Sequence, residues 1–285
     1  MDLEEQLGFN LFVRDKKRLV ELTEGGRTFV AEARSALLHT ERAVQLGRAA
    51  HGGADTILNV GHSPYADPAW VSTIFSIRLP LYPRLKIHLT SNFALELARC
   101  VVAGELDFAL VTAPPQDPQL SAMPFAYAPL CAVLLDSHEA ADKEQLELED
   151  LAQDEWIIYG KRVHPVLHEA IMKAMQRDAI TPRAVHHVIS AQHALQLVSD
   201  DIGVAVIKKP SMVERPPHRL VIKPIADASL RFETCVATRK SDSSRLVKEF
   251  TASFLRAQQS QPPKQLKLPM SVPDFSIRRR SGRAE

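Results

Sequence analysis

Residues 85–112 read LKIHLTSNFALELARCVVAGELDFALVT, and this stretch decides the fold class. Leu85–Thr90 and Phe108–Thr112 are apolar runs of the length of a strand, whereas Asn92–Ala103 spaces its apolar residues as a helix does. A strand, a helix and a second strand in succession predict two parallel strands joined by a helix that covers the sheet.

The same alternation runs from Thr56 to about Arg256. The further strands are predicted at Ile57–Gly61, Leu130–Leu135, Trp156–Tyr159, Val185–Ile189, Val204–Ile207, Leu220–Ile225 and Phe232–Thr238. The further helices are predicted at Asp67–Leu81, Pro165–Arg177, Ala191–Asp200 and Ser244–Ala257. We therefore predict an α/β fold with mainly parallel sheets, divided into two subdomains. Ligands bind such folds beyond the carboxyl ends of the strands, often in a cleft between subdomains.

A short hairpin and a long helix precede this α/β body. Leu3–Leu7 reads as the end of a helix that Gly8 terminates, and Phe9–Arg14 and Leu19–Leu22 are extended runs on either side of a polar turn. Lys16, Lys17 and Arg18 therefore lie at or next to the tip of a β-hairpin. Thr23 is then suited to cap a helix that runs to about Ala50.

One face of that helix carries small or apolar residues at alternating steps of three and four. These residues are Val30, Ala33, Leu37, Thr40, Val44 and Gly47. Such a seam is typical of a helix packed on a partner helix. Because no helix of matching character follows, we predict that it mediates dimerisation; packing on the chain's own body is the alternative.

Composition excludes several classes of protein. The 285 residues include 35 basic and 34 acidic side chains, a net charge of +1, so bulk charge does not direct the chain to nucleic acid. Cys100, Cys131 and Cys235 are too far apart for a disulfide framework or a zinc site. No apolar run approaches the roughly 20 residues that span a bilayer, and residues 1–10 lack the profile of a signal peptide. We expect a cytoplasmic protein without a membrane partner.

Catalytic and metal-binding motifs are missing from the sequence. Ser63 follows a strand but lacks the glycine that completes a nucleophile elbow. His164 and His168 lie four residues apart, yet no third ligand accompanies them, and we interpret them as the solvated start of a helix. We predict no catalytic residues, no metal and no cofactor, and hence no enzyme.

Polar residues that follow strands are more informative. They are Ser63, the group Thr90–Asn92, Thr112, the group Tyr159–Lys161 and the group Ser190–Gln192. Several of them lie where a helix begins, and the free N–H groups and partial positive charge of a helix N-terminus attract anions. Each alone is explained equally well as a helix cap. Together they predict a small, polar, anionic ligand.

Two motifs near the N-terminus resemble those of a known family. Residues 3–14 read LEEQLGFNLFVR and residues 22–26 read LTEGG, and at this spacing they resemble the end of the DNA-binding head and the start of the linker helix of LysR-type transcriptional regulators. Further similarities in the body are Leu58–Gly61, Tyr82-Pro83, Gly104–Val111 and Gly203–Ile207 with Pro210. The resemblance covers about residues 2–257.

This resemblance implies that residues 54–257 form an effector-binding domain similar to periplasmic binding proteins. Subdomain I would comprise about residues 56–127 and 228–257, and subdomain II about residues 128–227, joined by two crossing strands. The effector would lie in the cleft and contact Ser63, Ser91, Thr112, Tyr159, Lys161 and Gln192. Its binding would shift the arrangement of subunits in a homodimer or homotetramer.

The resemblance also assigns the remaining segments. Residues 1–22 would be the end of a recognition helix and the wing of a winged helix-turn-helix, residues 23–53 the linker, and residues 258–285 a disordered tail. Arg14, Lys16, Lys17 and Arg18 would contact DNA phosphates, which position a protein without reading sequence. We therefore expect a transcriptional regulator whose DNA reading is impaired in this chain. The alternative is a stand-alone small-molecule-binding protein or a dominant-negative dimerisation partner without specific DNA binding.

Overall fold

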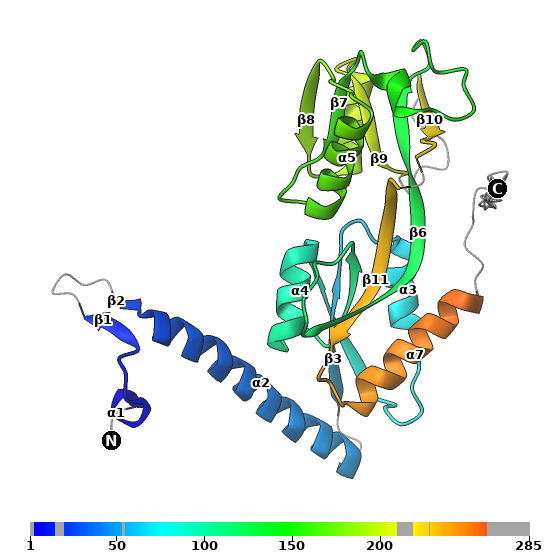
Figure 1. Ribbon diagram of the computed structural model, residues 1–285. Coiled ribbons are helices and arrows are strands. Elements are labelled where there is room, and N and C mark those ends of the chain that lie inside the picture. Colours follow the sequence, from blue (N-terminus) through cyan, green and yellow to red (C-terminus); the bar gives the residue numbers. More distant parts are fainter. Residues whose placement is uncertain (1–2, 15–19, 53–54, 210–218, 228, 261–285) are drawn as a thin grey trace, which may run out of the picture.

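The chain forms an N-terminal arm and an α/β body (Figure 1). The computed structural model describes residues 3–14, 20–52, 55–209, 219–227 and 229–260. The side chain of Arg14, the cations Lys16, Lys17 and Arg18, and residues 261–285 lie outside this description. The predictions for the hairpin tip and for most of the tail therefore stay predictions.

The arm consists of a short helix, a two-stranded hairpin and a long helix. These elements are α1 (Leu3–Leu7), β1 (Phe12–Arg14), β2 (Val20–Leu22) and α2 (Glu24–Gly52). Strands β1 and β2 are antiparallel, as the sequence predicts. Thr23 caps α2, because its Oγ1 accepts a hydrogen bond of 2.8 Å from the N–H of Gly26. Glu4 joins α1 to the hairpin, since its Oε1 accepts from the N–H of Leu11 at 2.6 Å.

Subdomain I is built on three parallel strands. Its elements are β3 (Thr56–His62), α3 (Pro68–Ser76), β4 (Leu85–Ser91), α4 (Ala94–Ala103), β5 (Phe108–Thr112) and α7 (Arg245–Ser260). Strand β3 lies between β4 and β5. Gly61 of β3 lets α4 approach closely, because a Cβ atom there would lie 2.7 Å from the side chains of Leu97 and Leu106. Helix α7 covers the sheet with Phe250 and Phe254, whose rings contact Phe108 edge-on.

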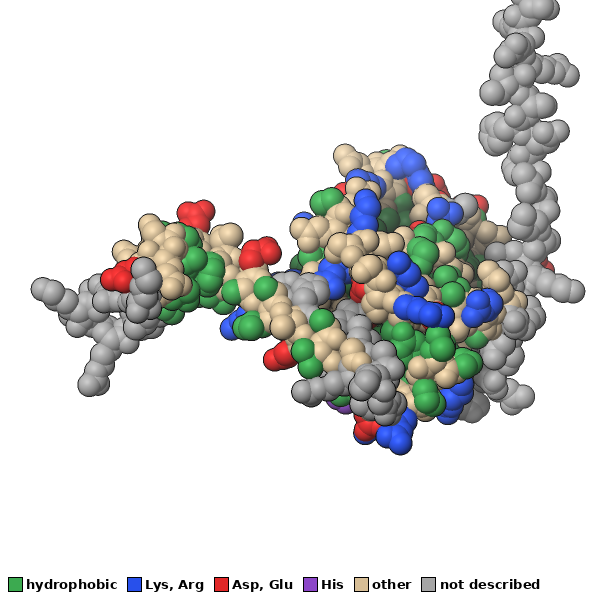
Figure 2. Space-filling model, turned by 90° about the horizontal axis from the view of Figure 1, so that it is seen from below, with side chains coloured by type: hydrophobic (Ala, Val, Ile, Leu, Met, Phe, Trp, Pro, Cys, Tyr) green, Lys and Arg blue, Asp and Glu red, His purple; other side chains and the backbone are tan. Residues whose placement is uncertain are grey.

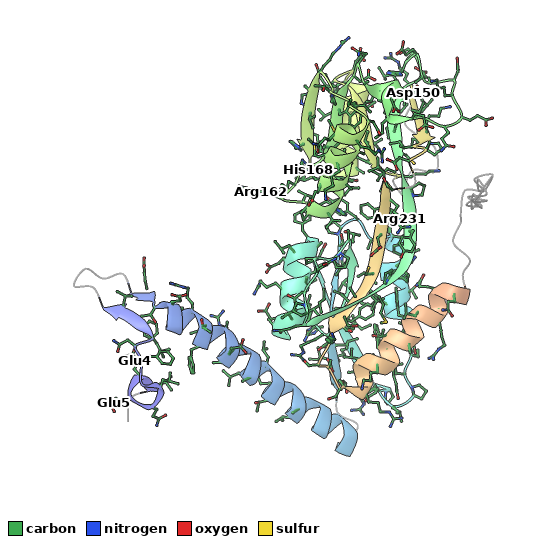
Figure 3. The ribbon with its side chains drawn as sticks, viewed as in Figure 1. Glu4, Glu5, Asp150, Arg162, His168 and Arg231 are labelled. Atoms are coloured by element: carbon green, nitrogen blue, oxygen red, sulfur yellow. The ribbon has the colours of Figure 1, made fainter. Side chains whose placement is uncertain are left out.

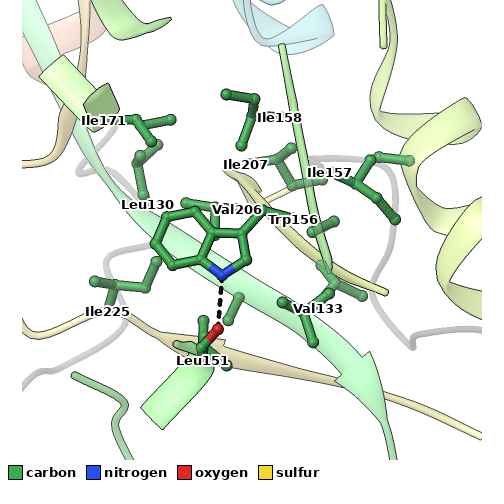
Figure 4. Packing of buried hydrophobic residues seen from close by; sticks show 14 of the residues in the cluster. Leu130, Val133, Leu151, Trp156, Ile157, Ile158, Ile171, Val206, Ile207 and Ile225 are labelled. Carbon is green, nitrogen blue, oxygen red and sulfur yellow. Dashed lines mark hydrogen bonds between the residues drawn. The ribbon is translucent and has the colours of Figure 1, made fainter. Parts of the chain in front are cut away.

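Subdomain II repeats this plan around a second set of strands. Its elements are η1 (Leu148–Leu151), β7 (Glu155–Tyr159), α5 (Pro165–Arg177), β8 (Ala184–Val188), α6 (Ala191–Ser199), β9 (Val204–Lys208) and β10 (Leu220–Pro224). Strand β7 lies between β8 and β9 and is parallel to both. Trp156 is the centre of the core (Figure 4), where its indole N–H donates to the carbonyl of Leu151 at 2.7 Å.

Two long strands connect the subdomains (Figure 1). Strand β6 (Leu120–Leu135) pairs with β11 (Arg231–Arg239) through its first ten residues, and its last residues pair with β9 and β10. All of these pairs are antiparallel, so the sheet order β4-β3-β5-β11-β6-β9-β7-β8 is mixed. The prediction of mainly parallel sheets was wrong in this respect, whereas the α/β fold and the two crossing strands are confirmed.

Several element boundaries differ from the sequence-based predictions. Helix α3 ends at Ser76 rather than Leu81, because Ile77 is extended and Pro80 follows. Strand β6 begins ten residues before Leu130. Helix α7 continues to Ser260, so Gln258–Ser260 belong to a helix and not to a disordered tail.

Candidate functional site

Two hydroxyl groups meet where the parallel strands of subdomain I end. Ser63 follows β3 and Thr112 ends β5, and their hydroxyl oxygens lie 3.1 Å apart. The N–H of Ser63 donates to the carbonyl of Leu110 at 2.8 Å, which continues the pairing of the two strands. Both residues are buried, with exposures of 0% for Ser63 and 1% for Thr112. The structure thus brings together two of the predicted site residues.

Tyr65 extends from this edge of subdomain I into subdomain II. Its N–H donates to Ser63 Oγ at 3.2 Å, and its hydroxyl donates to the carbonyl of Ile189 at 2.8 Å. The Tyr65 ring packs on the buried ring of Tyr159, with centres 4.7 Å apart. Burial raises the pKa of both phenols far above their usual range, so both remain neutral and Tyr65 keeps its donated proton. Tyr65 therefore bridges the two subdomains.

Lys208 approaches the same place from the carboxyl end of β9. Its ammonium group donates to the carbonyl of Tyr65 at 3.0 Å and lies 5.4 Å from the ring centre of Trp70 and 5.2 Å from that of Phe232. Burial lowers the pKa of this ammonium group, and the negative charge of Asp67 offsets part of that effect. A cation with one carbonyl and two aromatic faces as neighbours has spare capacity to bind an anion.

His164 is the N-cap of α5 and is 1% exposed. Its Nδ1 accepts a hydrogen bond of 3.3 Å from the N–H of Leu167, so the ring proton is on Nε2. That Nε2 is buried without a hydrogen-bond partner among the described residues. Burial lowers the pKa of His164 to about 4. The interpretation of His164 as part of a solvated helix start was therefore wrong.

The remaining predicted effector contacts are exposed. Ser91 ends β4, Lys161 precedes α5, and Gln192 lies in the first turn of α6, where Ser190 caps the helix by accepting from the N–H of His193. Figure 3 shows Arg162 and His168 at the end of subdomain II that faces subdomain I. In the present arrangement Ser91, Lys161 and Gln192 do not join the buried group around Tyr65, and they stay predictions.

No group of three possible metal ligands occurs in the described part of the chain. One pair of such residues is His168 on α5 and His187 on β8, whose Nε2 atoms lie 3.2 Å apart. Burial, and then the neighbouring His187, lower the pKa of His168. One neutral ring donating to the other explains this distance.

The predicted seam of α2 lies mostly in solvent. Leu37 is 65% exposed and Val44 46% exposed, Thr40 is exposed, and Val30 and Ala33 are half-buried. Figure 2 shows hydrophobic side chains along the arm that projects from the body. Large apolar side chains repeated on one exposed helix face indicate an interaction surface.

Sequence reasoning missed Tyr65, His164 and Lys208. Lys208 had a readable signal, because it is the polar residue that follows the four buried residues Val204–Ile207 at the end of a strand. His164 directly precedes Pro165, and proline is common in the first turn of a helix, which marks His164 as the capping position. Tyr65 had no comparable signal, because the carbonyl that its hydroxyl contacts lies 124 residues away in the sequence.

A comparison with protein families agrees with this architecture. The family model described as the LysR substrate binding domain matches residues 51–259. The chain belongs to this LysR family.

Relatives and solved structures support the assignment. The LysR chain is 25% identical to the HTH-type transcriptional regulator AlsR of Bacillus subtilis (strain 168), over 87% of this chain and 82% of the relative. The structure titled "Corynebacterium glutamicum OxyR C206 mutant" is 25% identical with a TM-score of 0.62, and the match covers 90% of this chain and 82% of that one. The structure titled "BenM effector binding domain with its effector benzoate" shares the fold at 17% identity and a TM-score of 0.62, over 74% of this chain and 98% of that one.

These findings establish the general role of the LysR chain. It is a LysR-type transcriptional regulator with an effector-binding domain, and its relatives are regulators rather than enzymes. None of the helices in the described ranges combines the length and the apolar character needed to cross a membrane.

Proposed function

We propose that this regulator binds a small anionic organic effector between its two subdomains and transmits the binding to DNA as an oligomer in the cytoplasm. The supporting observation is a group of polar atoms at the strand ends: the buried hydroxyls of Ser63 and Thr112, the half-buried ammonium of Lys208 and the buried Nε2–H of His164. In this proposal, subdomain I comprises about residues 56–127 and 228–257, and subdomain II comprises about residues 128–227. The buried His164 donor without an acceptor and the neighbouring Lys208 cation favour a ligand that supplies negative oxygen atoms.

Thermal unfolding in the presence of small organic acids tests this proposal. Acetate, succinate and benzoate form the panel. Benzoate is included because it is the effector of the BenM effector-binding domain, which has the same fold. A ligand at 100 times its Kd stabilises the folded protein by about 2.7 kcal/mol, which raises Tm by several degrees. We expect one of the acids to do so, and the double change Ser63→Ala with Thr112→Val to weaken its binding about 10-fold or more.

The matched control is Thr251→Val on α7. Thr251 is also a buried threonine, and its hydroxyl has no described partner and is remote from the strand ends. This variant should bind the acid as the wild-type protein does. A panel in which no acid raises Tm, or a double variant that keeps the full Tm shift, would contradict the proposed site.

DNA contact through the hairpin is the second part of the proposal. If Lys16, Lys17 and Arg18 each neutralise one phosphate, replacing all three with alanine should reduce the slope of log K against log salt by about 2.7. Fluorescence anisotropy with a duplex of random sequence measures this slope. The control replaces three exposed lysines of the body: Lys173, Lys240 and Lys248. Equal slopes for the hairpin variant and the wild type would show that the hairpin does not contact phosphate.

A further inference from the structure

Two hydrogen-bond donors near Tyr65 have fewer acceptors among the described residues than they have N–H groups. The His164 Nε2–H has no partner, although the residue is 1% exposed. The Lys208 ammonium carries three N–H groups, and the described residues provide one hydrogen-bond acceptor for it, the carbonyl of Tyr65. A buried donor without an acceptor is costly, so the His164 Nε2–H favours a ligand that supplies an acceptor.

The Phe232 ring lies close to both donors. The Lys208 Nζ lies 5.2 Å from the centre of the Phe232 ring, and the centre of the His164 ring lies 4.8 Å from the same point. The ammonium and the imidazole ring are therefore at most about 10 Å apart, a span that one small molecule bridges. One donor comes from β9 and the other from the start of α5, so both are fixed by elements of subdomain II.

Aromatic rings pack near these donors. Tyr65 packs on Tyr159 at 4.7 Å, on His164 at 5.8 Å and on Phe232 at 6.1 Å, measured between ring centres. Trp70 faces the Lys208 ammonium from subdomain I. Flat aromatic surfaces favour a flat ligand, since a planar body keeps the stacking contacts that the Tyr65 ring now makes. The Tyr65 ring occupies this place in the present arrangement, and a ligand would replace it there.

We propose that the Lys208 ammonium and the His164 Nε2–H bind the oxygen atoms of a planar carboxylate, an assignment that rests on the proposed effector-binding function. The cation selects the charged form of the ligand, and His164 supplies a second, neutral donor. Tyr65, which now contacts both subdomains, moves aside when the ligand binds. The hydrogen bond between Tyr65 and the carbonyl of Ile189 then breaks, so effector binding changes how the subdomains are joined.

Isothermal titration calorimetry with benzoate and its uncharged counterpart benzamide tests the assignment. Because a hydrogen bond to a charged group is stronger than one to a neutral group, the wild-type protein should bind benzoate about 10-fold or more tightly than benzamide. Lys208→Met should remove this preference while leaving the affinity for benzamide within about threefold. The matched control Lys209→Met changes the next residue, an exposed lysine, and should keep the preference.

A second variant tests the neutral donor. His164→Asn keeps an N-cap acceptor for α5 but removes the ring N–H, and it should weaken benzoate binding by about 3- to 10-fold. A purely structural role of Lys208 predicts that Lys208→Met weakens both probes equally, and this result would overturn the assignment.

The remaining outcomes separate the two proposals. If Lys208→Met keeps the wild-type preference for benzoate, or if the wild type shows no such preference, the carboxylate assignment is wrong. The effector-binding function survives either result as long as another acid of the panel raises Tm. If no acid of the panel binds, this result contradicts both proposals.

Discussion

Replacing Leu37 and Val44 with glutamate is expected to convert the regulator from dimers into monomers. Both side chains are large, apolar and exposed on the same face of α2, seven residues apart. In a dimer joined along this face they would be buried, and a buried carboxylate without a partner costs several kcal/mol. In a monomer the same substitutions lie in solvent and change the free energy of unfolding by about 0.5 kcal/mol or less. Light scattering should report a mass near 31.7 kDa for the variant.

The control adds the same two charges to a different face of α2. Thr28 and Ala31 are exposed and lie off the seam, so Thr28→Glu with Ala31→Glu should leave the dimer intact. Circular dichroism of both variants checks that α2 remains helical. A seam variant that keeps the wild-type mass would show that α2 does not join the subunits through Leu37 and Val44.

The sequence predicted those elements that local chemistry determines. Gly104 ends α4 with φ +82°, and Asp67 followed by Pro68 begins α3, with the Asp67 carboxylate accepting from the N–H of Ala69 at 2.9 Å. Each of these signals lies within a few residues of the boundary that it marks. Local signals of this kind mark most of the helices and strands. The alternation of helices and strands, and with it the α/β fold class, could therefore be predicted from the sequence.

The first half of β6 could not be predicted from the sequence, because its extended conformation depends on pairing with distant residues. Residues 120–129 include Pro124 and Pro129, and proline argues against a strand. They form a strand because β11, about a hundred residues later, pairs with them, and a register shift between Thr234 and Cys235 leaves Phe125 without a paired residue. Neither the pairing with β11 nor the register shift can be recognised from residues 120–129 alone.

In the candidate site, too, some residues were predictable from the local sequence and others were not. Ser63 and Thr112 were predicted together because both follow strands, and parallel neighbours place such residues at one edge. Tyr65 was not predicted, because its hydroxyl bonds to a carbonyl 124 residues away. Its role depends on how the subdomains close on each other, which a local pattern does not encode.

His164 should make the stability of the protein depend on pH between about 6.5 and 4. Its pKa in the folded protein is about 4, below the value of 6.5 for a free imidazole, because burial disfavours the charged ring. The unfolded chain therefore binds a proton in this range that the folded protein does not bind, and stability is lost as the pH falls. The loss from this residue amounts to about 2 kcal/mol at pH 5 and about 3 kcal/mol at pH 4.

The comparison of wild type with His164→Asn isolates this contribution, because other titrating groups contribute equally to both proteins. The phenol of Tyr65, whose ring packs on His164, stays neutral in this range, because burial raises its pKa. Urea unfolding at pH 7 and pH 5 should show a smaller loss of stability in the variant, by about 2 kcal/mol, with asparagine still capping α5. Equal losses in the two proteins would mean that His164 titrates normally, which requires solvent at its Nε2. Water beside Lys208 would then accept the hydrogen bond of the His164 Nε2–H. The absence of a protein acceptor for this group would no longer indicate a ligand.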